Sequence, residues 1–123
     1  MDLFVKVFKA LGEPTRLKIL RILSVRPMYV CELESVLNIS QPRISQHLRV
    51  LKEAGVLREA KEAQKTFYML NGDIIERVFG DFIQFLGEDI GKLPGFEKET
   101  ARIANLDSDS CVQSCKNVNS AGS

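Results

Sequence analysis

Apolar residues recur every three or four positions through most of the first 90 residues, which is the spacing of amphipathic helices. The pattern predicts five helices, at about residues 3–11, 14–26, 30–37, 41–54 and 72–86. Gly12 ends the first helix, Pro27 closes the second, and Gly55 ends the fourth. The chain is therefore predicted to be mainly α-helical.

A β-hairpin is predicted directly after the fourth helix. Residues 56–61 and 65–70 have the composition of strands, and the polar residues 62–64 join them. The fold class is accordingly mainly α with a small β-hairpin.

The signal for regular structure weakens towards the C-terminus. Residues 96–106 predict a short helix, whereas residues 107–123 are poor in apolar side chains and predict a flexible tail. We therefore expect one domain at residues 1–93 and a C-terminal extension at residues 94–123.

The turn between the third and fourth helices has the chemistry of a helix-turn-helix. Asn38 tolerates a left-handed backbone, Ile39 can point inward, and Ser40 is a good N-cap for the helix that follows. Two helices joined by so short a turn predict a helix-turn-helix, and the hairpin after it predicts a wing.

The fourth helix has one apolar and one polar face. Its predicted buried stripe is Ile44, Leu48 and Leu51, spaced four and three residues apart. The major groove of DNA admits one helix, where Gln pairs with adenine and Arg with guanine. We predict that the DNA-binding residues are Ser40, Gln41, Arg43, Ser45, Gln46, His47 and Arg49 on the helix, with Arg58, Lys61, Gln64 and Lys65 on the wing.

The charge is divided unevenly along the chain. Residues 1–70 carry a net charge of +5 and residues 71–123 carry −4, which together give the overall +1. A basic half beside an acidic half indicates that the first half meets a polyanion. The apolar runs are too short to span a membrane, and the N-terminus has no cleavage site for secretion. We expect a cytoplasmic protein with reduced thiols and no membrane partner.

Two segments carry a family resemblance: ALGEPTRLKILRIL, and VCELESVLNISQPRISQHLRVLKEAGVLREAKEAQKTFYML. From about Leu3 to Leu86 the chain resembles the ArsR/SmtB family of metal-sensing winged-helix repressors. The resemblance implies a homodimer that binds a near-palindromic operator in double-stranded DNA and releases it when an inducer binds. It also implies that the first and fifth helices form the dimer interface.

The resemblance does not name the inducer. One site of the family uses a Cys-x-Cys pair in the third helix; here Cys31 matches the second thiol and Tyr29 replaces the first. Another site uses histidine and carboxylate pairs across the fifth helix. This chain has no histidine after His47, so we expect that zinc-type site to be missing.

Three cysteines are the candidate metal ligands: Cys31, Cys111 and Cys115. Structural zinc prefers four ligands, whereas three thiolates suit trivalent arsenic or antimony. Cadmium, lead and Cu(I) are soft enough to stay open as alternatives. Cys31 could instead be a small buried side chain, and the other two could be idle thiols in a tail. No organic cofactor is expected.

The predicted function is a DNA-binding repressor that leaves its operator when a thiophilic inducer, with arsenite or antimonite as the predicted ion, binds the thiolates. The alternative is a repressor of the same fold that senses redox state or persulfide, with Cys111 and Cys115 forming a bridge. A winged helix that binds only proteins also stays open. A thiol enzyme is not expected, because no cysteine lies in a phosphate-cradling loop.

Overall fold

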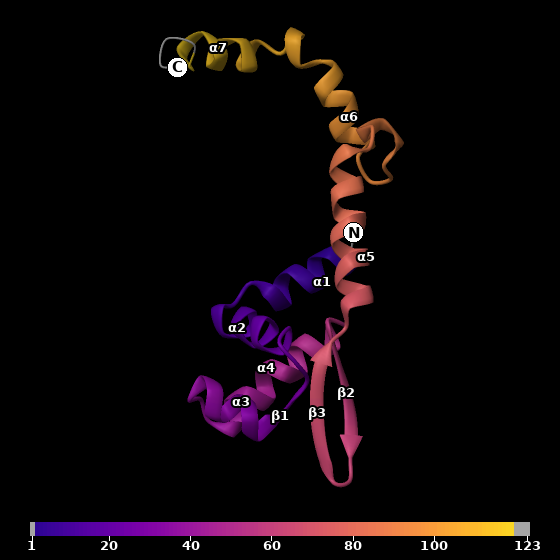
Figure 1. Cartoon of the computed structure of the whole chain (residues 1–123). Coiled ribbons are helices and arrows are strands. Elements are labelled where there is room, and N and C mark those ends of the chain that lie inside the picture. Colours follow the sequence, from indigo (N-terminus) through magenta and orange to yellow (C-terminus); the bar gives the residue numbers. More distant parts are fainter. Residues whose placement is uncertain (1, 120–123) are drawn as a thin grey trace. The chain divides into compact units, whose positions relative to one another are not determined.

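Short helices and a small sheet surround one apolar core in the first part of the chain (Figure 1). The computed structural model describes residues 2–119, and its contacts divide the chain into two units between Ile83 and Gln84. This division falls inside the last helix of the first unit, whereas the expected domain boundary follows residue 93. The first unit contains α1 (Asp2–Leu11), α2 (Pro14–Leu23), β1 (Met28–Tyr29), α3 (Val30–Leu37), α4 (Gln41–Glu53), β2 (Leu57–Glu62), β3 (Lys65–Leu70) and most of α5 (Gly72–Gly87).

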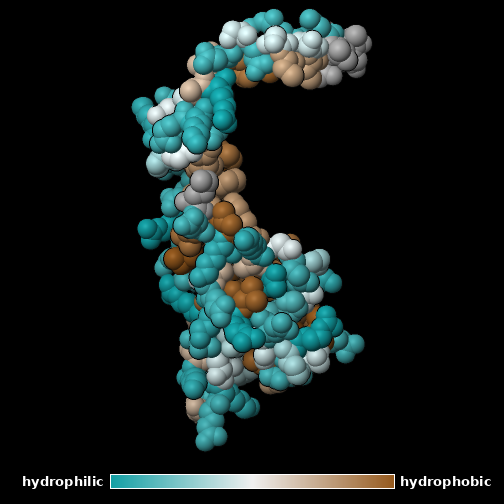
Figure 2. Space-filling model, turned by 180° about the vertical axis from the view of Figure 1, so that it is seen from behind, coloured by the Kyte–Doolittle hydropathy of each residue, from teal (hydrophilic) through white to brown (hydrophobic). Residues whose placement is uncertain are grey.

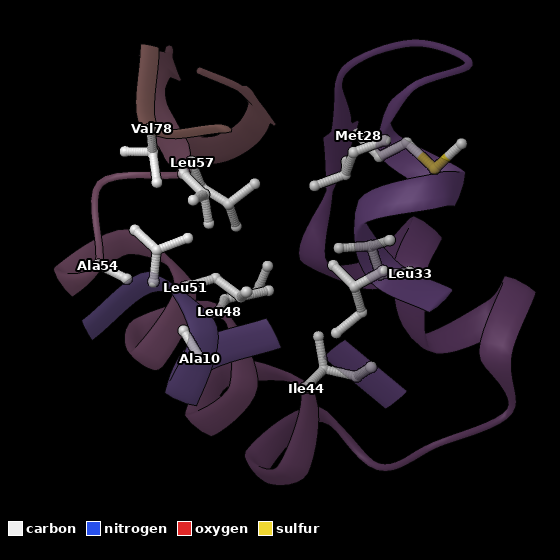
Figure 3. Close-up of a cluster of buried hydrophobic side chains, with 13 residues drawn as sticks. Ala10, Met28, Leu33, Ile44, Leu48, Leu51, Ala54, Leu57 and Val78 are labelled. Atoms are coloured by element: carbon white, nitrogen blue, oxygen red, sulfur yellow. The ribbon is translucent and has the colours of Figure 1, made fainter. Parts of the chain in front are cut away.

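The core is built around α4. Ile44, Leu48 and Leu51 are fully buried and belong to one cluster with Leu33 of α3 and Val78 of α5 (Figure 3). The predicted buried stripe is therefore confirmed, and α4 is fixed to the rest of the unit along one face.

The sheet has three antiparallel strands in the order β1–β3–β2. The predicted hairpin is confirmed, with a two-residue turn at Ala63 and Gln64 in place of the predicted three-residue loop. Strand β1 was not predicted. It pairs Met28 with Tyr68 and Tyr29 with Phe67, and two residues are too few to show the alternation that reveals a strand.

Within the described residues 2–119, the second unit is helical. It contains the end of α5, short 3₁₀ turns at Ile90–Lys92 and Leu106–Ser108, α6 (Glu97–Ala104) and α7 (Ser110–Asn119). Helix α6 confirms the predicted short helix.

The segment predicted as a flexible tail is helical over α7. The carboxylate of Asp109 accepts hydrogen bonds from the amides of Cys111 and Val112, so it starts this helix as an N-cap does. Residues 120–123 of the predicted tail lie outside the described residues. Within the described chain, every helix is too short or too polar to cross a bilayer.

Candidate nucleic-acid interface

The turn between α3 and α4 determines where α4 begins. Asn38 is left-handed (φ 54°, ψ 48°), and its amide donates to the carbonyl of Glu34 at 2.8 Å. Ile39 packs against the core, and Ser40 occupies the N-cap position. These placements were predicted, but the expected side-chain cap does not form. Pro42 in the first turn removes one of the amides that such a cap would satisfy.

The face of α4 opposite the core is polar and exposed. Gln41, Arg43, Gln46 and Arg49 are exposed, whereas Ser45 is half-buried and accepts a hydrogen bond of 2.7 Å from Nε2 of Gln41. Arg43, Gln46 and Arg49 have no side-chain hydrogen bond or ion pair within residues 2–119. Their donors are therefore available to a ligand.

His47 does not lie on this exposed face, and its predicted placement there is wrong. Its side chain is only 16% exposed, because it follows Ile44 by three residues and so borders the buried stripe. Its Nδ1 has no hydrogen-bond partner in the described chain and lies 3.8 Å from Oε2 of Glu13. The same oxygen accepts from the amide of Arg16, a bond that lowers the pKa of Glu13. His47 therefore faces the start of α2.

The wing residues fall into two groups. Arg58 lies at the end of the hairpin far from the turn, with Nη2 3.4 Å from Oδ2 of Asp73 in α5. At the turn itself, Ala63 is left-handed (φ 57°). The other three predicted wing residues are exposed at or beside that turn: Lys61, Gln64 and Lys65. The structure thus brings three of the four cationic or amide groups to the wing tip.

Tyr29 connects the start of α3 to the wing, which the sequence interpretation missed. Its hydroxyl donates to Oε2 of Glu62 at 3.1 Å, and this bond raises the pKa of Tyr29. Its ring meets Phe67 edge-on at 5.8 Å, and Nζ of Lys65 lies 5.7 Å from the ring centre. Its amide donates to Oε1 of Glu32 at 3.0 Å. A glutamate three residues after the N-cap position, here Glu32 after Tyr29, is the sequence signal that could have indicated this cap.

A second contact with the hairpin is an ion pair between α4 and β2. Nζ of Lys52 lies 2.5 Å from Oε1 of Glu59. This hydrogen bond lowers the pKa of Glu59 and raises that of Lys52. The charged forms of both groups are therefore favoured in the folded protein.

The three cysteines lie on two units. Cys31 is in the first turn of α3 and exposed, so it is not the buried small side chain considered above. It lines a shallow pocket with Ser35 beside the turn to α4. Cys111 and Cys115 are exposed on α7, four residues apart, where helix geometry gives about 5–6 Å between Cβ atoms. This pair can supply two sulfurs to one soft ion. Residues 2–119 contain no group of three His, Cys, Asp or Glu side chains arranged to hold a metal.

The helix-turn-helix segment matches a known protein family. Residues 13–59 match the family described as bacterial regulatory proteins of the arsR family. The transcriptional repressor SdpR of Bacillus subtilis is 35% identical over 82 residues, which cover 67% of this chain and 91% of that protein. The arsenical resistance operon repressor of Escherichia coli is 39% identical over 71 residues, which cover 57% of this chain and 61% of that protein.

Solved structures show the same fold. HlyU from Vibrio cholerae superposes with a TM-score of 0.57 at 34% identity, covering 69% of this chain and 91% of that chain. The homodimeric winged helix-turn-helix DNA-binding domain Mb0332 from Mycobacterium bovis superposes with a TM-score of 0.59 at 26% identity, covering 70% and 79%. Fold and sequence agree with these relatives, and the chain belongs to the ArsR family of winged helix-turn-helix transcriptional regulators.

Proposed function

We propose that the protein is a transcriptional repressor that binds double-stranded operator DNA with α4 in the major groove. The observation that carries this proposal is the exposure of Arg43, Gln46 and Arg49 on a helix whose opposite face is fully buried. A helix held rigidly along one face can offer free hydrogen-bond donors to base edges without first breaking protein contacts. As a member of a family of DNA-binding regulators, the protein is not an enzyme.

The side chains on α4 and the wing suit different parts of a duplex. Gln46 can pair with adenine through two hydrogen bonds, and Arg43 or Arg49 can pair with guanine, at about 1–3 kcal/mol of discrimination per pair. Lys61 and Lys65 at the wing tip suit phosphates, which position the protein but carry no sequence information.

Operator binding as a homodimer is part of the proposal. In the first unit, apolar side chains of α1 and α5 stay exposed, among them Leu3 (41%), Phe79 (38%) and Ile83 (69%). Figure 2 shows apolar patches on one face of this unit. The rings of Phe8 and Phe82, 4.8 Å apart, already join α1 to α5. A second copy covering this surface would present two α4 helices to half-sites about 34–36 Å apart.

Binding of the reduced protein to the DNA upstream of its own coding region, compared with random duplex, tests the DNA-binding proposal. We expect a preference for the upstream DNA and a linear fall of log affinity with log salt. The variant Arg49→Gln should weaken the preference, whereas Lys98→Gln, a change of the same charge in α6, should leave it intact. Equal affinity for both duplexes would refute the proposal.

We propose that the inducer is arsenite or another thiophilic ion. The thiolates of Cys31, Cys111 and Cys115 would bind it in a reducing cytoplasm. The donor chemistry fits, because Cys111 and Cys115 share one exposed helix face and Cys31 is exposed beside the turn that starts α4. Relatives named for arsenical and cadmium resistance support a soft ion. Release requires that the ion bind the DNA-free form more tightly, by a coupling of about 1–3 kcal/mol.

Arsenite titration of the preformed operator complex tests the inducer. Cys31→Ser should bind the operator normally and resist release, whereas Ser35→Ala, a change in the same pocket, should release normally. Arsenic K-edge absorption should count three sulfurs around the ion in the wild type and two in Cys31→Ser. Normal release from Cys31→Ser would remove this thiol from the site.

Redox sensing is the second candidate, and the spacing of Cys111 and Cys115 favours it. Positions four apart on a helix place the Cα atoms near the upper end of the 4.4–6.8 Å range that a disulfide spans. Mass spectrometry after mild oxidation, with operator binding measured on the same sample, distinguishes the two chemistries. A bridge that releases DNA in the absence of any metal supports redox sensing.

A further inference from the structure

The wing tip carries two opposite charges that the structure keeps apart. Glu62 and Lys65 are direct cross-strand partners on either side of the turn, the arrangement in which opposite charges ordinarily pair. Within residues 2–119 they form no ion pair with each other. Each instead contacts Tyr29: the carboxylate accepts from its hydroxyl at 3.1 Å, and Nζ of Lys65 lies 5.7 Å from its ring centre.

Tyr29 can hold these two side chains because its own position is fixed by the sheet and by the start of α3. Its backbone pairs with Phe67 in the sheet, its ring meets the ring of Phe67, and its amide is held by Glu32 at the start of α3. Lys65 and Glu62 lie on the exposed wing tip, whereas Tyr29 is half-buried. The half-buried Tyr29 therefore restrains the two exposed side chains.

We infer that Tyr29 is a positioning residue of the DNA-binding surface, which holds the Glu62 carboxylate and so leaves the Lys65 ammonium available for a phosphate of the operator backbone. A carboxylate paired with Lys65 would neutralise that cation and would also repel the phosphate. The inference rests on the proposed operator binding and assigns a role to the position where related proteins were expected to have a metal-binding thiol.

The variant Tyr29→Phe isolates the hydroxyl. It keeps the ring contacts with Phe67 and Lys65 but frees the carboxylate of Glu62 to pair across the strand. We expect a salt slope shallower by about 0.9 per wing, the value of one phosphate contact, and an affinity at 0.1 M salt lower by about fivefold to tenfold per wing. Tyr68→Phe, which removes the hydroxyl of the other tyrosine of this sheet, is the matched control and should leave the slope unchanged.

Second-site changes separate positioning from a general loss of stability. Adding Glu62→Gln to Tyr29→Phe should restore the affinity and the slope, because the freed side chain no longer carries a charge. Lys65→Gln should reproduce the loss, and adding Tyr29→Phe to it should cost nothing more. The thermal midpoint of each variant shows whether the fold is intact.

The hydrogen bond itself can be measured without DNA. The protein has two tyrosines, so ultraviolet titration of their phenolates should show that Glu62→Gln lowers the pKa of Tyr29. If the wild type binds the operator and Tyr29→Phe binds it with the same affinity and the same salt slope, the inference is overturned. The proposed function still stands in that case. A wild type with no operator preference would overturn both. Failure of Glu62→Gln to rescue Tyr29→Phe would also overturn the inference.

Discussion

Replacing Leu48 with alanine should remove a large part of the stability that holds α4 in place. Leu48 lies in the middle of α4 and is fully buried in the cluster that joins this helix to the rest of the unit. Loss of three buried carbons at about 0.8 kcal/mol each costs about 2.4 kcal/mol of unfolding free energy. The cavity that the surrounding side chains fail to fill raises the cost to as much as about 5 kcal/mol.

A loss of this size is a large part of the about 5–15 kcal/mol that keeps a typical domain folded. Urea unfolding followed by circular dichroism measures it, because the midpoint should fall while the slope stays unchanged. Leu17→Ala is the matched control: the same chemical change in α2 at a side chain that is 51% exposed should cost under about 1 kcal/mol. A loss below about 1 kcal/mol for Leu48→Ala, or equal losses for the two variants, would refute the packing argument.

Other predictions concern base reading, the wing turn and pH. Gln46→Ala should cost about 1–3 kcal/mol of operator binding and relax specificity at one base pair, as measured on a set of single-base operator variants. Ala63→Gly should raise the unfolding free energy by about 0.5–1 kcal/mol, since φ 57° strains alanine but not glycine; a thermal midpoint that falls would contradict this. Because Lys52 lowers the pKa of Glu59 below its usual 4.5, their pairing stabilises the protein above that pH and is lost as the pH falls through the lowered value. Glu59→Gln should therefore flatten the acid decline of stability in urea titrations at successive pH values, and an unchanged decline would count against the pair.

The helix α4 could be predicted from the sequence because it carries redundant signals. The stripe of Ile44, Leu48 and Leu51 fixes the buried face of α4, and Asn38 marks the turn before it with a left-handed backbone. Gly55, with φ 87°, marks the end. Local propensity, periodicity and turn chemistry agree at these positions, which is the condition under which sequence alone specifies structure.

Contacts between distant segments could not be predicted in the same way. The hydroxyl of Tyr29 meets Glu62, 33 positions later, and Nδ1 of His47 faces Glu13 on a different helix. Neither pair shares an element, so no periodicity relates its members. His47 was assigned to the exposed face because a polar residue beside a buried stripe fits either environment.

The contact between Tyr29 and Glu62 has a physical meaning for the candidate site, which the ion pair between Lys52 and Glu59 shares. A carboxylate near a DNA-binding surface repels phosphate unless another group holds it. Glu62 is held by the hydroxyl of Tyr29, and Glu59 is held by the ammonium of Lys52, so both acidic residues of the hairpin have protein partners. Lys61 and Lys65, by contrast, form no ion pair in the described chain. The hairpin therefore offers cationic groups to a duplex although its charges nearly balance, and the count of charges along a segment is a poorer guide to DNA binding than the contacts that each charge already makes.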